Sequence, residues 1–181
     1  MRDSITVNRV DELHPKIVQM VKDGIAEAED KLGPYAAIRI VQGLRTFAYQ
    51  AGLYELGRTK KNPNGSSPRH PYGNVVTNAK AGQSIHNYGL AFDFAIMYDL
   101  DKNGSFETLS WNLKTDENKD GLADWAEVVN IFKAKGFTWG GDFKSITDSP
   151  HLEYSRGHDY KYFLQLYTDK KFIPGTTFVA I

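Results

Sequence analysis

Two short stretches hold side chains suited to binding a metal ion. The first contains His86 and, seven positions later, Asp93; the second contains His151. Residues 90–96 alternate large and small side chains, which predicts a β-strand with Asp93 as the only carboxylate on its small face. An ionised carboxylate inside a sheet is costly unless a positive group or a metal meets it. Two imidazoles and one carboxylate would leave a fourth position open, as in catalytic zinc sites.

A hydrolytic zinc site also needs a base that is not a ligand. Asp148 lies three residues before His151 across a Ser-Pro turn, where it could take a proton from the attacking water and pass it to the leaving amine. Arg45 follows a predicted strand and could stabilise the oxyanion or bind a substrate carboxylate. Each residue also has an ordinary interpretation: a surface histidine, a core Asp bonded to backbone amides, a turn-forming Asp, a solvated Arg. Spacing alone leaves both interpretations open.

Composition narrows the class of protein. The 181 residues suit one domain, and 41% hydrophobic residues provide for a core. Lys+Arg and Asp+Glu both number 22, so a broadly basic surface for nucleic acid is not expected. No apolar run is long enough to span a membrane, and the N-terminus lacks the apolar core of a secretory signal. The absence of cysteine excludes disulfides and thiolate zinc sites.

The elements that must position these residues follow from periodicity. Apolar spacing predicts helices over residues 11–32, 46–56, 122–135 and 159–167, with Thr46 as an N-cap. Strands are expected over residues 36–43, 90–96, 137–139 and 151–154, with a further short strand at 74–77. Residues 57–82 read as a long loop, which is usually functional or mobile. The expected fold is α+β: a small, mostly antiparallel sheet with helices packed on one side.

A second kind of metal site is indicated between residues 99 and 127. Residues 116–127 fit the calcium-loop pattern D-x-[DN]-x-[DN]-G-x5-E, with oxygens from Asp116, Asn118, Asp120, the Leu122 carbonyl and Glu127. An upstream loop opens in the same way with Asp99, Asp101, Asn103 and Ser105, but has Ser110 in place of the bidentate Glu, for which Glu107 could partly compensate. The alternative for both is a solvated acidic loop. We expect them to be calcium-binding insertions in a single domain spanning residues 1–181.

Several motifs in order resemble one family. Ser84, His86, Gly89, Ala91 and Asp93, followed by Asp148, Pro150 and His151, are similar to the zinc D-Ala-D-Ala carboxypeptidases, a group that includes VanX- and VanY-like enzymes and the L-alanyl-D-glutamate endopeptidases of phage endolysins. The segments around Arg45, 50–59, 76–79, 82–84 and 139–143 extend the resemblance to the endolysin branch. It implies the fold shared with the hedgehog domain, zinc bound by His86, Asp93 and His151, Asp148 as acid/base and Arg45 on the scissile carbonyl. It also implies that Gln83 and Ser84 contact either the residues that bind the metal or the substrate.

The expected function is zinc-dependent, calcium-modulated hydrolysis of the L-alanyl-D-glutamate bond in peptidoglycan stem peptides. One alternative is a carboxypeptidase that removes terminal D-Ala, and another is a non-catalytic hedgehog-like module that binds zinc and calcium. The expected partner is peptidoglycan, without nucleic acid or membrane insertion, and the expected state is a monomer. The loop at residues 60–71 is longer than the family pattern and could alter substrate choice.

The expected place of action is the bacterial wall. Without a signal peptide, we expect a phage lysin made in the host cytoplasm that acts on the wall. A secreted enzyme whose signal had been trimmed would have the same sequence pattern, so the sequence leaves that alternative open.

Overall fold

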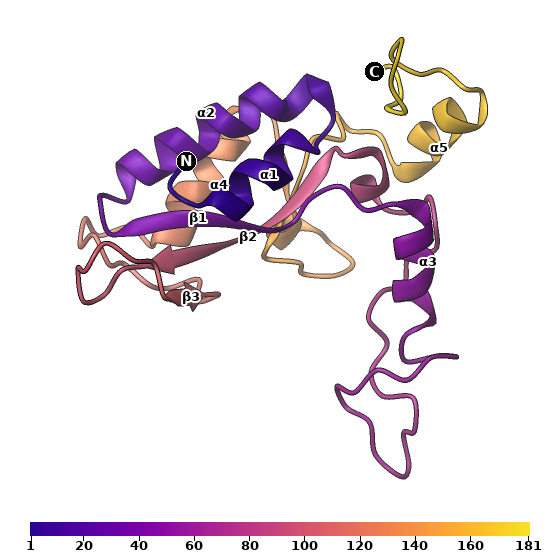
Figure 1. Cartoon of the computed structure of the whole chain (residues 1–181), viewed down its shortest axis with the longest axis horizontal. Coiled ribbons are helices and arrows are strands. Elements are labelled where there is room, and N and C mark those ends of the chain that lie inside the picture. Colours follow the sequence, from indigo (N-terminus) through magenta and orange to yellow (C-terminus); the bar gives the residue numbers. More distant parts are fainter. The chain divides into compact units, whose positions relative to one another are not determined.

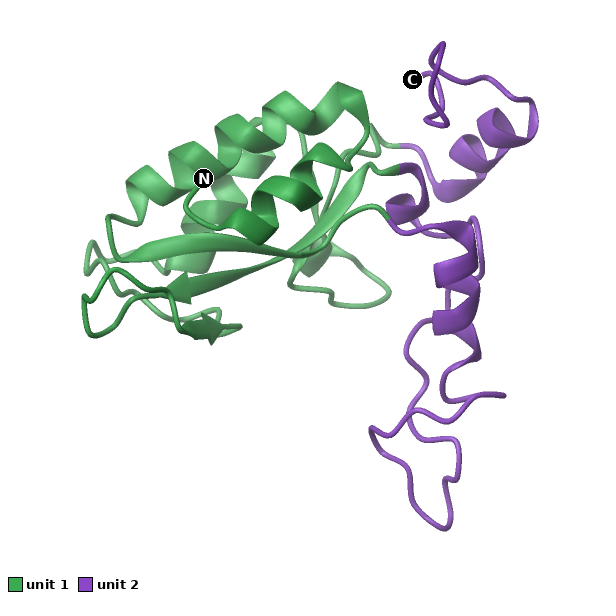
Figure 2. Cartoon of the chain, viewed as in Figure 1, with its two compact units in different colours: residues 1–44, 89–157 green, residues 45–88, 158–181 purple.

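A computed structural model describes all 181 residues, which form two compact units (Figure 2). The first unit comprises residues 1–44 and 89–157, and the second comprises residues 45–88 and 158–181. Each unit is therefore built from two separate segments of the chain. The expectation of a single domain stays a prediction.

The first unit contains the whole antiparallel sheet (Figure 1). Its strands are β1 (Ala36–Gln42), β2 (Ala91–Tyr98), β3 (Thr108–Ser110), β4 (Thr138–Trp139) and β5 (His151–Glu153). The order is β1-β2-β5-β4, and β3 pairs with β2 off this path. The predicted α+β class is confirmed. The sequence did not indicate β3, because its three residues are too few to show alternation and only the pairing with β2 defines it.

The large face of β2 forms the core, as its alternation predicts. Phe92 and Phe94 are fully buried, and they pack on Phe132 and Trp125 with ring centroids 5.1 and 4.4 Å apart. Both partners belong to α4 (Asp124–Ala134), which lies beside α2 (Pro15–Lys31). A Cβ on Gly24 of α2 would lie 2.7 Å from the Phe132 ring, so only glycine allows the two helices this close approach.

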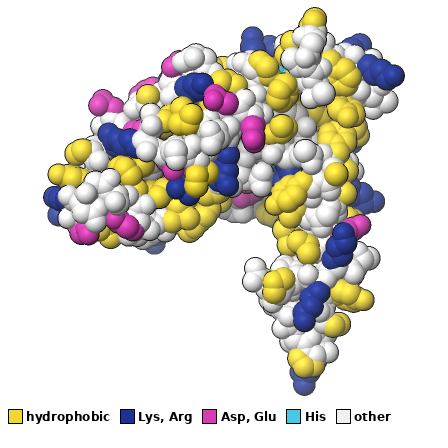
Figure 3. All heavy atoms as spheres, viewed as in Figure 1, with side chains coloured by type: hydrophobic (Ala, Val, Ile, Leu, Met, Phe, Trp, Pro, Cys, Tyr) yellow, Lys and Arg dark blue, Asp and Glu magenta, His cyan; other side chains and the backbone are white.

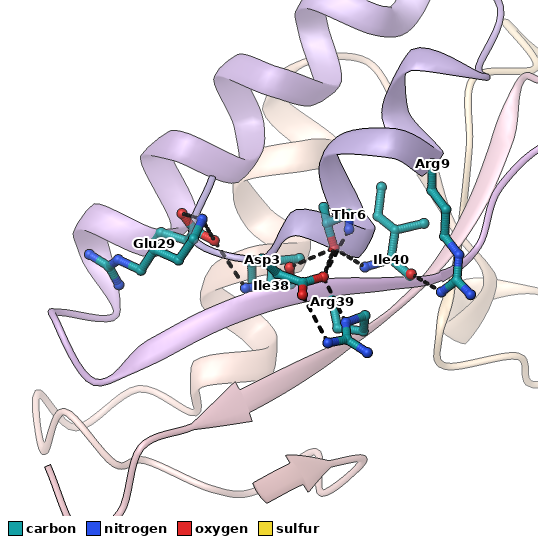
Figure 4. A network of polar contacts seen from close by, with 8 residues as sticks. Asp3, Thr6, Arg9, Glu29, Ile38, Arg39 and Ile40 are labelled. Atoms are coloured by element: carbon teal, nitrogen blue, oxygen red, sulfur yellow. Dashed lines mark hydrogen bonds and ion pairs between the residues drawn. The ribbon is translucent and has the colours of Figure 1, made fainter. Parts of the chain in front are cut away.

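The edge of the sheet is covered by a helix that the sequence did not indicate. The apolar spacing predicts one helix from residue 11, but α1 (Ser4–Asp11) ends there and α2 begins at Pro15. The Thr6 hydroxyl of α1 donates to the Ile38 carbonyl and accepts from the Ile40 amide of β1 (Figure 4). Glu29 of α2 accepts from the Ile38 amide. These contacts satisfy backbone groups that an open edge strand would expose to another chain.

The second unit contains α3 (Phe47–Glu55), the 3-10 helix η1 (Ile85–Tyr88) and α5 (Tyr160–Thr168). Thr46 caps α3 as predicted, since its side chain accepts from the Tyr49 amide. The buried Tyr88 ring of η1 packs between Phe47 and Phe163 at 6.0 and 5.5 Å. These aromatic contacts join η1 to α3 and α5 within this unit. No helix of either unit is long and apolar enough to cross a membrane.

The long segment between α3 and η1 is organised by its own polar groups. The expected strand at residues 74–77 is absent, because the Asn74 amide donates to the Asn64 carbonyl within the loop. The side-chain amide of the buried Asn62 donates a hydrogen bond to the Asn74 carbonyl at 2.8 Å. Residues 56–84 contain five Lys or Arg and no Asp or Glu, and Figure 3 shows Lys and Arg side chains on this segment. This segment is therefore positively charged, although the net charge of the whole chain is zero.

Candidate active site

Asp93 and His151 meet across the sheet of the first unit. Antiparallel pairing of β2 and β5 places their Cα atoms directly opposite each other. The Asp93 Oδ1 and His151 Nδ1 atoms are 3.1 Å apart, and His151 is 7% exposed. The sequence predicts a strand for each residue, and the register brings their side chains together. A carboxylate oxygen and an imidazole nitrogen at one point form a donor pair that suits zinc.

Glu153 completes the surroundings of His151. It lies two residues further along β5, on the same face, and its Oε2 is 3.1 Å from His151 Nε2. Burial lowers the pKa of His151, but the carboxylates of Asp93 and Glu153 outweigh that effect and raise it to about 9. The two carboxylates thus give these surroundings a negative potential, which favours a cation. The i, i+2 spacing on a strand places Glu153 on the face of His151, but the sequence predicts no role for it.

Asp148 is held beside this pair by a tight turn. Its amide donates to the Gly140 carbonyl at 3.0 Å, and its carbonyl accepts from the His151 amide at 3.1 Å. A Cβ on Gly140 would overlap the Asp148 carbonyl oxygen and lie 2.9 Å from the His151 Cβ. The Trp139 indole also donates to the Ser149 carbonyl at 2.7 Å. The Trp139-Gly140 pair therefore fixes the turn that carries Asp148.

The second unit holds the other predicted active-site residues. His86 lies in η1 and is 3% exposed, and its carbonyl accepts from the Arg45 amide at 3.0 Å. The Arg45 guanidinium donates to the side-chain oxygen of the buried Gln50 at 3.0 Å. Within this unit, the fold brings the backbones of His86 and Arg45 together although α3 and the whole long loop separate them in the sequence.

Gln83 and Ser84 lie just before η1 in the same unit. The Gln83 side chain accepts from the Lys80 amide at 3.0 Å, and the Ser84 amide donates to the Asn87 side chain at 3.3 Å. The Asn87 side chain in turn donates to the Arg45 carbonyl at 2.8 Å. Asn87, for which the sequence predicts no role, thus links the segment of Ser84 to Arg45. Both predicted substrate contacts are half-buried.

The downstream acidic loop is held by hydrogen bonds from its own backbone amides to its acidic side chains. Asp116 accepts from the amides of Asp120 and Gly121 at 3.2 and 3.1 Å, and Asp120 accepts from the Leu122 amide at 3.0 Å. Gly121 has a φ of 91°, which favours glycine at the turn. The Asn118 side chain donates to Glu127 Oε2 at 3.1 Å. The ligand residues predicted from the motif therefore lie around one loop.

Two carboxylates at the start of α4 are buried with incomplete hydrogen bonding. Glu127 and Asp124 are 3% and 1% exposed, and Glu127 Oε1 and Asp124 Oδ1 have no hydrogen-bond partner. Burial raises the pKa of both groups. Buried charged oxygens without such partners are costly, so a cation at this loop would relieve that cost. Asp124 occupies the ninth position of the motif, where calcium loops often bind through water, and it was not among the predicted ligands.

The upstream loop repeats the same pattern. Asp99 accepts from the amides of Asn103 and Gly104 at 3.0 and 2.9 Å, and Asn103 accepts from the Ser105 amide at 2.8 Å. Asp99, Asp101 and Glu107 can bring one oxygen each to within 4.8 Å of the others. Glu107 therefore lies where it could replace the missing twelfth-position Glu. This loop is more exposed than the downstream one.

Comparisons with known proteins identify the family. Residues 77–154, which include His86, Asp93, Asp148 and His151, match the family described as D-alanyl-D-alanine carboxypeptidase. The chain is similar to the peptidoglycan L-alanyl-D-glutamate endopeptidase CwlK of Bacillus subtilis, with 44% identity over 142 residues that cover 78% of this chain and 73% of the relative. It is also similar to a crystal structure of Serratia marcescens L-Ala D-Glu endopeptidase ChiX, with 18% identity, a TM-score of 0.48, and coverage of 83% of this chain and 86% of that chain. The chain belongs to the M15 family of metallopeptidases.

Proposed function

We propose that the protein is a zinc-dependent endopeptidase that cleaves the L-alanyl-D-glutamate bond of peptidoglycan stem peptides. The substrate follows from the relative at 44% identity, whose name states this activity. The observation that carries the chemistry is the pairing of Asp93 with His151, next to the turn that presents Asp148. Membership of a peptidase family favours an enzyme over a non-catalytic binding module. The presence of both Asp148, the proposed base, and the Asp93–His151 pair favours an enzyme as well.

His86, Asp93 and His151 are the proposed zinc ligands. Their donors are two imidazole nitrogens and a carboxylate oxygen, and all three residues fall in the family match. Glu153 would accept a hydrogen bond from the ring nitrogen of His151 that does not face Asp93, which orients the imidazole. When bound, zinc supplies a Lewis acid that activates water and polarises the scissile carbonyl.

The chain's own groups then move the protons and stabilise charge. Asp148 accepts a proton from the attacking water and delivers it to the departing amine nitrogen. Arg45, held by Gln50, stabilises the negative charge that develops on the carbonyl oxygen. Gln83 and Ser84 are proposed to contact the substrate stem peptide. These roles are supported by the family resemblance and by the local contacts within each unit.

Product analysis of purified peptidoglycan tests this function. We expect mass spectrometry to find new C-terminal L-Ala and N-terminal D-Glu, and no such products with EDTA. Free D-Ala without these termini would instead support the second candidate, a carboxypeptidase, which the description of the matched family favours. No metal-dependent product of either kind would overturn the proposal.

We also propose that the downstream loop, through Asp116, Asn118, Asp120, Leu122 and Glu127, binds calcium and that this raises activity. The upstream loop, through Asp99, Asp101, Asn103 and Ser105, is a second candidate. The support is the motif, the repeated loop geometry and the two buried carboxylate oxygens. Adding calcium to EGTA-treated protein during hydrolysis tests it, and an unchanged rate would contradict calcium activation.

The proposed place of action is the cell wall, where the substrate lies. That the enzyme is a monomeric phage lysin, made in the host cytoplasm and released to the wall, stays a prediction. Sedimentation velocity of the purified protein tests the monomer.

A further inference from the structure

A lysine from another helix lies within the downstream loop. Lys31 is the last residue of α2, and its ammonium Nζ lies 3.3 Å from Asp120 Oδ2 and 3.5 Å from Glu127 Oε1. Asp120 and Glu127 stand at the fifth and twelfth positions of the calcium motif. The ammonium therefore contacts two of the loop carboxylates that are expected to bind the ion.

Lys31 compensates the buried charge of Glu127 only in part. Its side chain is 1% exposed, and Oε1 accepts no hydrogen bond, whereas the Lys31 side chain is 56% exposed. A solvent-exposed ammonium is screened by water and salt, so it compensates a buried carboxylate weakly. The buried Oε1 of Glu127 has only the exposed Lys31 ammonium near it, at 3.5 Å, and this structural observation, which the sequence motif does not contain, indicates a cation ligand.

The backbone of Lys31 also holds the loop. The Asn118 side-chain amide donates to the Lys31 carbonyl at 3.3 Å and to Glu127 Oε2 at 3.1 Å. The Asn118 side-chain oxygen accepts from the Asp120 amide at 3.1 Å. The end of α2 therefore contacts the third, fifth and twelfth positions of the motif. This arrangement can keep the loop folded when no ion is bound.

We propose that the Lys31 ammonium occupies the cation position of the downstream loop in the calcium-free protein and competes with calcium for Asp120 and Glu127. Calcium binding displaces the ammonium while the carbonyl of Lys31 continues to hold Asn118. Lys31 thereby lowers the calcium affinity of the loop and stabilises its folded form when the ion is absent. This inference rests on the calcium site proposed above.

Substitution of Lys31 by Met tests the competition, because Met keeps most of the apolar stem and removes the charge. By calorimetric titration of EGTA-treated, dialysed protein with calcium alone, we expect K31M to bind about three- to tenfold more tightly than the wild type, since it loses two ammonium–carboxylate contacts. The advantage should shrink at high salt, which screens the ammonium in the wild type. We also expect a lower Tm for K31M without calcium and a wild-type Tm with saturating calcium.

Two controls separate charge competition from general effects. K135M removes a comparable ion pair, Lys135 with Glu27 at 2.7 Å, which also joins α4 to α2 but does not touch the loop, so its calcium affinity should match the wild type. K31R keeps the charge and should also stay near wild-type affinity. K31Q removes the charge with a polar side chain and should bind calcium about as tightly as K31M, which preserves the test if K31M folds poorly. Equal or weaker calcium binding by K31M, with a wild type that does bind, would overturn the competition alone. No calcium binding by the wild type would overturn the calcium site and this inference together.

Discussion

Asp93 Oδ1 and His151 Nδ1 lie 3.1 Å apart, on residues that pair directly across β2 and β5. The pair joins a strand that runs through the centre of the core to a three-residue strand next to the Asp148 turn. A donor pair built on strands is held more firmly than one built on loops, because both backbones are fixed by the ladder. The position of any metal here therefore depends on the register of these two strands.

Replacing Asp148 by Asn should remove activity without removing zinc. The amide keeps the size and the turn but cannot accept the proton, so we expect turnover on peptidoglycan fragments to fall by roughly 10²- to 10⁴-fold. Metal content by mass spectrometry should stay at the wild-type level. The control is Asp142→Asn, which changes an exposed Asp that pairs with Lys133. Wild-type turnover by Asp148→Asn would refute the role of Asp148.

Replacing Glu153 by Gln should weaken metal binding through His151. The neutral amide would accept from the ring nitrogen less strongly than the carboxylate, and loss of such a partner typically lowers metal affinity by about 10- to 100-fold. Competition with a chromogenic chelator measures the zinc affinity, with Glu12→Gln at the exposed end of α1 as a control. Unchanged affinity in Glu153→Gln would show that this contact does not position the imidazole.

Replacing Gly140 by Ala should displace the turn that carries Asp148. The added methyl group would overlap the Asp148 carbonyl oxygen, which is backbone and cannot move aside without shifting Asp148. We expect a loss of turnover of at least about tenfold and a lower Tm, because overpacking typically costs about 1–3 kcal/mol. Gly52→Ala in α3 is the matched control: nothing lies within 4 Å of its added Cβ, and a helix interior favours Ala. Equal activity in both variants would contradict the role given to Gly140.

The Asp3–Arg39 pair should make stability depend on acid pH. Burial opposes ionisation of Asp3, but hydrogen bonds from Arg39, at 2.7 and 2.8 Å, and from the Thr6 amide hold its pKa below the usual 3.8. The contribution of the pair to the free energy of unfolding is thus complete above the pKa that Asp3 has in the unfolded state. It is lost as the pH falls through the lower pKa of Asp3 in the folded state. We expect Asp3→Asn to be less stable at neutral pH by about 1–3 kcal/mol.

Thermal unfolding across pH measures this effect. The difference in Tm between the wild type and Asp3→Asn should shrink as pH falls below 3.8, the usual value for Asp. Asp30→Asn, at an exposed position of α2, should show no comparable change. A difference that stays constant down to the lowest pH at which the wild type folds would contradict the assignment to Asp3 ionisation.

The sequence alone determined the features that depend on neighbouring residues. Alternation over residues 90–96 identified the core strand, and the buried Phe92 and Phe94 confirm it. The acidic loops were also recognisable, because their backbone amides donate to side-chain oxygens only two to five residues earlier in the chain. Thr46 capped its helix as predicted for the same reason. The ordered motifs identified the family, which the comparisons confirm.

The tertiary structure decided the features that depend on which distant segments meet. Asp93 and His151 are 58 residues apart, and only the register of β2 with β5 places them opposite each other. Lys31 and Asp120 are 89 residues apart, and no local pattern connects the end of one helix to a loop before another. Local periodicity tells which face of an element is buried but not what packs against it, because pairing partners are selected by the whole core. The sequence therefore predicted the residues and the type of reaction, and the fold determined which other residues lie next to them.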